Sequence, residues 1–224
     1  MFSSHAFRSL SLATAVVAAS TGAQAALVIP VNFLVADCVQ AFSTESIDAL
    51  AVTGVSVTAL GNASLVANSE ASYAMPITTI TISSSLKIAK GDAKGSALQF
   101  TRVYRGNTLS LTLANFTLNY DTKKVLADVT PSGGTTTKQQ VIYNFHTATP
   151  LGIKYQFPLK ITGHEVLDQL FLSPESVESF MTGLSLAKAA RSVLGGVDFG
   201  TLTQDIAVKL RAKPVSTTLY VPAP

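Results

Sequence analysis

Residues suited to chemistry are few in this chain, and the histidines are the clearest of them. After residue 25 the chain has two histidines, His146 and His164. His164-Glu165, with Asp168 four residues after the histidine, resembles half of the HExxH motif of zinc proteases, but Asp168 replaces the second histidine. Two histidines also cannot supply a three-histidine site within one chain. A solvated histidine beside an acid is the commoner arrangement, so we expect no metal site.

Other catalytic patterns are absent from the sequence. No Gly-x-Ser-x-Gly segment is present to form the sharp turn that exposes a nucleophilic serine. Gly133-Gly134 lacks the lysine of a phosphate-binding loop. The carboxylates are few and scattered, so no pair can be nominated for glycoside hydrolysis. We therefore expect a protein that is not an enzyme.

Tyrosine and histidine could instead serve as axial ligands to haem iron. The candidate ligands for a haem held between sheets are Tyr143, His146 and His164, with Tyr104 and Tyr120 as further tyrosines in strand-like segments. The alternative is that the tyrosines lie in strands because aromatic side chains pack well there. This alternative needs no ligand, so we assign no cofactor from these residues and keep the three as candidate haem ligands only.

The first 25 residues read as a signal peptide. Arg8 supplies a positive charge, residues 10–21 form a short apolar run, and Ala23-Gln24-Ala25 fits the small-x-small cleavage rule. The run is too short for a membrane-spanning helix, and no later stretch approaches spanning length. The sequence therefore predicts an exported protein, in the periplasm, the cell envelope or the medium, that does not span the membrane.

The composition of the chain limits the classes of partner that it could bind. The chain has 16 Lys plus Arg against 13 Asp plus Glu, and 13% charged residues is about half the usual share. No basic stripe with interleaved aromatics is present, which disfavours nucleic acid. Cys38 is the single cysteine, so the chain has no internal disulfide and must depend on a hydrophobic core.

Residues 96–129 organise the rest of the chain as a meander of about three strands. Gly106 and Asn107 suit a two-residue hairpin loop, because both tolerate positive φ. In the return strand the apolar residues change from odd to even numbers at Ala114-Asn115. A slip of one residue moves every side chain to the other face, so this change predicts a bulge or a sharp bend.

Two short helices with matching caps flank the meander. Ser43 and Ser173 each precede a Glu two residues later and a helical apolar pattern, and Pro174 suits a first helical position. Each helix is followed by Thr-Gly and a short apolar segment, which suggests two equivalent corners of one domain. Convergence on good cap chemistry is the alternative.

The remaining segments are short strands separated by turns, which is typical of a sandwich or barrel. The predicted fold is mainly β, an antiparallel β-sandwich or partly open barrel with two short capped helices. We expect a single β-rich domain over residues 26–213 and a C-terminal tail over 214–224. Residues 90–95 are expected to be a flexible lead into the meander. In residues 153–161 five apolar residues alternate, which predicts that Phe157 is buried against the opposite sheet.

Two segments carry a family resemblance. The first comprises Leu98-Gln99-Phe100, Gly106-Asn107, residues 109–118 and Leu126-Ala127-Asp128-Val129. The second is the Ser43-capped helix followed by Thr-Gly and a Val-rich strand. Together they resemble secreted bacterial Htaa-type domains over roughly half of the chain after residue 25. The resemblance implies a β-rich envelope module. Some such domains bind haem through Tyr and His, but those ligand positions do not map onto residues of this chain.

The function that these observations favour is a non-catalytic, exported β-rich protein with a structural or binding role in the cell envelope or extracellular space. The alternative is a carrier of haem or another small apolar ligand. The partner is therefore either an envelope component or such a ligand, and the sequence does not choose between them.

Export gives the first testable expectation. Cleavage after Ala25 would leave Ala26 at the N-terminus of the protein recovered from its native host. Mass spectrometry of the intact exported protein measures this directly. Exported, folded protein that still carries residues 1–25 would contradict the signal-peptide assignment.

Overall fold

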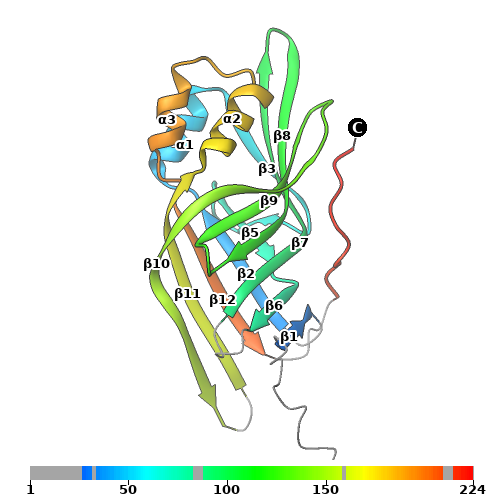
Figure 1. Ribbon diagram of the computed structural model, residues 1–224, viewed down its shortest axis with the longest axis vertical. Helices are drawn as coiled ribbons and strands as arrows, with labels where there is room; N and C mark the ends of the chain where they lie inside the picture. Colours follow the sequence, from blue (N-terminus) through cyan, green and yellow to red (C-terminus); the bar gives the residue numbers. More distant parts are fainter. Residues whose placement is uncertain (1–26, 32–33, 83–87, 158–159, 209–213, 224) are drawn as a thin grey trace, which may run out of the picture.

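A computed structural model describes residues 27–31, 34–82, 88–157, 160–208 and 214–223 (Figure 1). The predicted signal peptide over residues 1–25 and its cleavage site lie outside the described residues.

The described residues form twelve strands and three short helices, so the fold is mainly β. The strands are β1 (Leu27–Pro30), β2 (Leu34–Ala41), β3 (Val55–Gly61), β4 (Ser64–Leu65), β5 (Ser72–Pro76), β6 (Thr79–Ile82), β7 (Ile88–Tyr104), β8 (Asn107–Asn119), β9 (Lys124–Pro131), β10 (Thr137–Gln156), β11 (Lys160–Leu172) and β12 (Thr201–Val208). The helices are α1 (Thr44–Val52), α2 (Pro174–Gly183) and α3 (Ala190–Gly196).

All strands belong to one antiparallel sheet that curls into a nearly closed barrel. The strand order is β1-β6-β7-β8-β9-β10-β11-β12-β2-β5-β4, and β3 pairs with the second half of β7. Two residues separate β5 from β6, yet β5 pairs with β2 and β6 pairs with β7, so this short connection links the two halves of the strand order. The mainly β prediction is confirmed, and of the two predicted forms, sandwich and partly open barrel, the structure adopts the barrel, which is nearly closed.

The meander of β7, β8 and β9 is confirmed, together with its bulge. In the β8–β9 ladder Ala114 pairs with Asp128 but Thr117 pairs with Leu126, and Asn115 has a φ of 56°. Because of this bulge, the apolar side chains before and after it point into the same core, as the change from odd to even positions predicts. The hairpin loop lies one residue earlier than expected. Tyr104 pairs with Asn107, so Arg105 and Gly106 take the two positive-φ positions.

Two other expectations are wrong. Residues 90–95 belong to β7 and are not a flexible lead, because β6 pairs with them through Thr79 and Asp92. Phe157 is 90% exposed and is not buried. Beyond Asn144, β10 pairs with β11 alone, and the β10–β11 hairpin extends past the barrel, so it has no opposite sheet to pack on (Figure 1).

The helices gather at one end of the barrel (Figure 1). Ser43 and Ser173 each accept a hydrogen bond from the backbone N–H three residues on, which confirms both predicted caps. The correspondence ends after α2, where a turn leads into α3 and not into a strand. α3 was not predicted, because Ala189 precedes it and provides no side-chain cap.

The core fills the barrel and continues beneath the helices. Phe100 is fully buried and makes edge-to-face contacts with Phe42 and Phe180, at centroid distances of 6.4 and 4.8 Å. Phe180 belongs to α2 and Phe100 to β7, so this cluster holds the helical end of the barrel against the meander.

Phe100 and Phe157 form a matched pair for testing the barrel. Phe100→Ala should destabilise the protein by about 3–5 kcal/mol, since it removes buried apolar surface and leaves a cavity. Phe157→Ala should change the free energy of unfolding by less than about 0.5 kcal/mol, because the side chain is solvated. Denaturant midpoints measure both. A large loss for Phe157→Ala would mean that the hairpin packs against something in solution.

Candidate functional site

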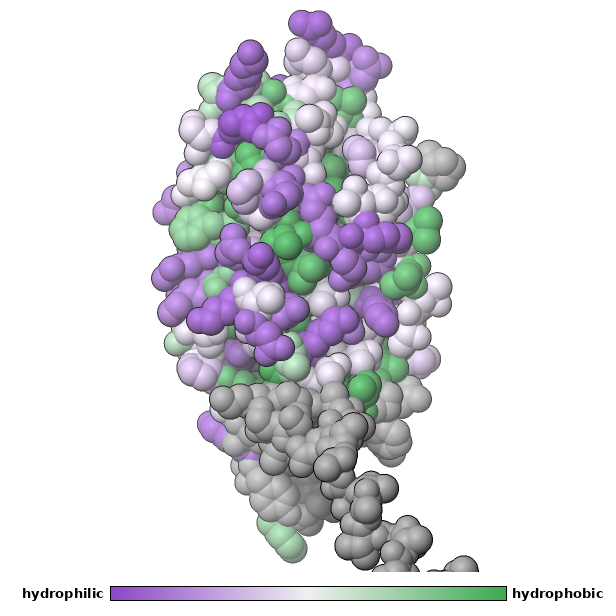
Figure 2. Space-filling view, in the orientation of Figure 1, coloured by the Kyte–Doolittle hydropathy of each residue, from purple (hydrophilic) through white to green (hydrophobic). Residues whose placement is uncertain are grey.

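An apolar groove lies between α1 and α3 at the helical end of the barrel. Its volume is about 520 Å³, within the range of small-molecule sites. The apolar wall consists of Ala49, Val52, Leu186, Val193, Leu194 and Val197. Val52 is 89% exposed and Val193 is 46% exposed, so the opposed helix faces leave apolar side chains uncovered. Elsewhere on the face of Figure 2, apolar residues are interspersed with polar ones.

Charged residues border this groove without filling it. Glu45 and Asp48 come from α1, and Arg102 comes from β7. The Arg102 guanidinium donates to the backbone carbonyls of Leu184 and Ser185 and lies 4.7 Å from the centre of the Tyr104 ring. These contacts fix its position at the edge of the groove. The groove therefore offers apolar surface to the body of a ligand and charge at its border.

No residue that lines the described groove can bind haem iron, because none is His, Tyr, Cys or Met. Its single hydroxyl, on Thr53, donates to the carbonyls of Ala49 and Leu50 and closes the end of α1. The groove thus contains a surface for an apolar molecule but neither an iron ligand nor a free nucleophile.

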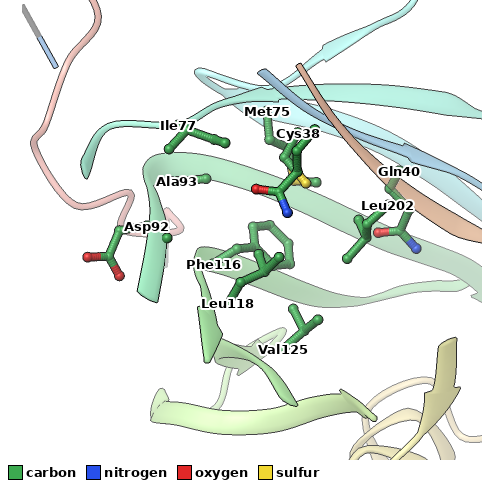
Figure 3. A pocket seen from close by; sticks show the side chains of 12 residues that line it. Cys38, Gln40, Met75, Ile77, Asp92, Ala93, Phe116, Leu118, Val125 and Leu202 are labelled. Atoms are coloured by element: carbon green, nitrogen blue, oxygen red, sulfur yellow. The ribbon is translucent and has the colours of Figure 1, made fainter. Parts of the chain in front are cut away.

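The interior of the barrel leaves little room for a ligand. The cavity among Cys38, Met75, Phe116 and Leu202 has space for about one water molecule (Figure 3). The labelled side chains of Cys38, Met75, Phe116, Leu118 and Leu202 converge from strands on opposite sides and fill the space between them. A haem between sheets would require this packing to open.

A buried polar cluster lies deeper in the same interior. The Tyr120 hydroxyl donates to Glu165 Oε2 at 2.6 Å, and Gln204 Nε2 donates to the same oxygen at 2.7 Å. Glu165 is 4% exposed, and burial raises the pKa of its carboxyl, an effect that the Tyr120 hydrogen bond partly offsets. Burial also raises the pKa of Tyr120. The cluster satisfies its own hydrogen bonds, which is how an interior carboxyl is tolerated.

Cys38 lies on the inner face of β2, 2% exposed. Burial, together with the negative charges of Glu165 and Asp37, raises the pKa of the thiol to about 12. It is therefore a protonated, structural thiol and a poor nucleophile at neutral pH.

The structure does not bring the three candidate haem ligands together. Tyr143 is 1% exposed, and its hydroxyl accepts a hydrogen bond from Gln40 Nε2 inside the core. His146 and His164 are on the outer face, four positions apart along the β11 register, because His146 pairs with Asp168. At about 3.3 Å per residue, this separation is roughly 13 Å.

Each histidine has a carboxylate partner. His146 Nδ1 lies 2.8 Å from Asp168 Oδ1, and His164 Nδ1 lies 2.8 Å from Asp205 Oδ1. Both pairs are exposed, and each leaves Nε2 directed away from the carboxylate. His164 alone also borders a groove of about 400 Å³, between Val35, Lys154 and Ala207. Among the described residues, no three His, Cys, Asp or Glu side chains are grouped to hold a metal ion.

The groove between α1 and α3 was not predicted. Its strongest signal was Val52, an apolar residue at the end of a helix whose buried residues lie on another face. The partner helix α3 lacks a side-chain cap, so no local pattern predicted the helix that lies opposite Val52.

Comparison with known proteins bears on the fold. No family model and no curated protein matches the chain. Its structure is similar to that of the C-terminal domain of HtaA from Corynebacterium glutamicum, with a TM-score of 0.51 and 12% sequence identity. The match covers 78% of this chain and 97% of that domain. The predicted resemblance to Htaa-type domains is confirmed as a weak likeness of fold.

None of the helices in the described part of the chain is long and apolar enough to cross a membrane.

Glu165 supplies a test of the interior cluster. Its pKa is raised in the folded state, so the unfolded state loses its proton first as pH rises. The contribution of the protonated carboxyl to stability is therefore full below the unfolded pKa and is lost as pH rises through the folded pKa. Glu165→Gln removes this titration and keeps a hydrogen-bonding oxygen. We expect the variant to gain stability relative to the parent as pH rises from 4 to 8.

Denaturant midpoints across that pH range measure the difference. Glu70→Gln, at an exposed position, is the control and should show no such trend. A stability difference between Glu165→Gln and the parent that is independent of pH would contradict the assignment.

Proposed function

We propose that this protein is an exported, non-catalytic binding module of the cell envelope or extracellular space, and that it holds a small apolar ligand in the groove between α1 and α3. The observation that carries this proposal is the uncovered apolar surface of Val52 and Val193 on opposed helices. Apolar side chains of this size are normally buried or scattered singly, and a concave group of them is typical of a binding site.

The border of the groove supports a particular class of ligand. The body of the ligand would lie against the apolar wall, and a polar end would reach Arg102 or the solvent. The guanidinium is already held by two carbonyls, so it can offer a remaining N–H without losing its position. Because Glu45 and Asp48 lie on the same border, an acidic end would have to approach from the side of Arg102. A mainly apolar molecule therefore fits better than a polar one.

The non-catalytic part of the proposal rests on the hydroxyl group in the groove and on the positions of the two histidines. The one hydroxyl in the groove is engaged in closing α1, and the two His–Asp pairs lie on other parts of the sheet. The likeness of fold to the HtaA domain supports an envelope address, because the Htaa resemblance implies exported modules.

Haem carriage is the second candidate function, and His164 is the observation that favours it. Its Nδ1 faces Asp205, an arrangement that fixes the ring orientation of a histidine ligand. Its ring also borders a groove that contains Lys154, whose ammonium group would pair with a haem carboxylate. The Htaa resemblance implies haem binding for some members of that group. This candidate uses a different surface from the α1–α3 groove, so the two can be separated.

Val193→Glu tests the first proposal. A carboxylate in the apolar wall should weaken the binding of a fluorescent apolar probe, anilinonaphthalene sulfonate, by at least about tenfold, since an apolar site solvates charge poorly. Val103→Glu is the matched control, because Val103 is 70% exposed on β7 and does not line the groove. Equal probe affinities for the two variants would rule out the groove as the site.

Hemin titration followed by absorption tests the second candidate. If His164 binds the iron, a Soret shift should appear with the parent protein and disappear in His164→Ala. His146→Ala keeps the shift, because His146 has the same kind of carboxylate partner but does not border the His164 groove. A shift that survives in His164→Ala would exclude His164 as the ligand.

A further inference from the structure

The C-terminal tail, residues 214–223, lies along the outside of the barrel as an extended segment without helix or strand (Figure 1). It runs past the second half of β7 and the bulge in β8. The side chains of Asn62 and Asn115 form hydrogen bonds with it, and Gly95 lies close beneath it. We call these three residues the tail cradle.

The tail cradle recognises main-chain atoms. Asn115 Oδ1 accepts from the Tyr220 N–H at 2.8 Å, and Asn115 Nδ2 donates to the Tyr220 carbonyl at 3.0 Å. Asn62 Nδ2 donates to the Ser216 carbonyl at 2.7 Å. The Asn115 amide bonds both the N–H and the carbonyl of one residue, as the backbone of a neighbouring strand would. Main-chain hydrogen bonds of this kind are how sheets bind extended peptides.

The cradle is held in place by the barrel itself. Asn115 is 2% exposed, its Oδ1 also accepts from the Gly95 N–H, and its Nδ2 also donates to Asp128 Oδ2. A primary amide has two donor hydrogens and two acceptor lone pairs, so the barrel uses half of this capacity and Tyr220 uses the other half. Without a bound segment, Asn115 keeps one donor and one acceptor directed outwards.

Gly95 lets the segment approach closely. A Cβ at this position would lie 2.8 Å from the Thr218 carbonyl oxygen, and the residue has a φ of +78°. The neighbouring Asn115 has a φ of 56°, which carries a conformational cost for a residue with a Cβ. Such costs gather at functional sites.

The tail lies on the surface and is not part of the core. Leu219 is 47% exposed and Val221 is 75% exposed, so docking leaves their side chains in solvent. Beside the tail, a groove of about 610 Å³ remains between Tyr220–Ala223 and the hydroxyl side chains of β8 and β9. The tail can therefore leave the cradle without opening the hydrophobic core.

We propose that the tail cradle is a receptor for an extended peptide segment, and that the tail of a second copy of this chain occupies it by reciprocal exchange. The tail is the one segment known to fit, and residues 214–224 carry no charged side chain that would oppose the approach of a second copy. The hydrogen bonds of the tail cradle go to main-chain groups, so a tail from another copy makes the same hydrogen bonds. Exchange of identical elements is a common route to symmetric dimers.

A synthetic peptide of residues 214–224 tests the receptor. The full-length Tyr220→Pro chain lacks the N–H that Asn115 accepts, so its own tail docks poorly and its cradle is open. This chain should bind the peptide in a saturable one-to-one titration. The same peptide with an N-methyl group on Tyr220 should bind roughly tenfold more weakly, because the buried Asn115 Oδ1 loses one of its two hydrogen bonds. The Tyr220→Ala chain keeps the N–H, so its tail should stay docked and block the peptide.

Mixing two full-length variants tests the exchange. Asn115→Gly keeps the positive-φ position and removes the receptor amide, and Tyr220→Pro keeps the receptor and disables the tail. In sedimentation velocity each variant alone should be monomeric, the equimolar mixture should contain a heterodimer, and the parent chain should dimerise with rising concentration. Failure of the Tyr220→Pro chain to bind the peptide overturns the receptor. Peptide binding without a heterodimer in the mixture overturns the exchange. Neither result depends on the α1–α3 groove.

Discussion

Closure of the barrel depends on the short segment between β5 and β6. The Ile77 N–H donates to the Ala36 carbonyl at 2.9 Å, and the Thr78 N–H donates to the Asp92 carbonyl at 2.7 Å. Two adjacent residues thus bond to β2 and to β7, which lie in opposite halves of the strand order. The Thr78 hydroxyl adds a bond to Asp92 and accepts from the Lys94 N–H. Because buried backbone groups need partners, these hydrogen bonds keep the short segment between β5 and β6 joined to both strands.

Closure determines what the interior can do. Strands that meet all around a narrow barrel direct their inner side chains at one another, and these side chains fill the space. Phe116, Leu118 and Met75 are among the side chains that fill it (Figure 3). The polar groups Glu165 and Gln204 bond to each other and to Tyr120. The interior therefore supports the fold, and the surfaces proposed for binding lie on the outside of the barrel.

The outside offers three surfaces of different chemistry, each produced by an irregularity of the regular sheet. The α1–α3 groove exists because helices interrupt the strand order at one end. The His164 groove lies next to the register shift between Thr149 and Gly152, in the part of β10 that pairs with β11 alone. The tail cradle lies at the bulge of β8, where Asn115 is buried in a left-handed conformation. A uniform barrel would present none of these surfaces.

Local sequence patterns were sufficient where neighbours in the chain decide the structure. The caps at Ser43 and Ser173, the bulge at Asn115 and the alternation of the meander all depend on residues a few positions apart. These predictions are confirmed, and so is the mainly β class. The Htaa resemblance, read from the same meander, agrees with the weak likeness of fold.

Other features could be found only in the tertiary structure. An alternating pattern predicts which residues share a face of a strand, but it does not predict which element packs against that face. Phe157 follows the same pattern as a buried strand, yet no element of the described structure covers it at the end of the hairpin. Residues 90–95 look flexible in isolation but pair with β6. Val52 and Val193 are 141 positions apart, and Asn115 and Tyr220 are 105 apart. The sequence by itself determined the strands, the caps and the bulge, whereas the tertiary structure brought these distant residues together and so placed the surfaces proposed for binding.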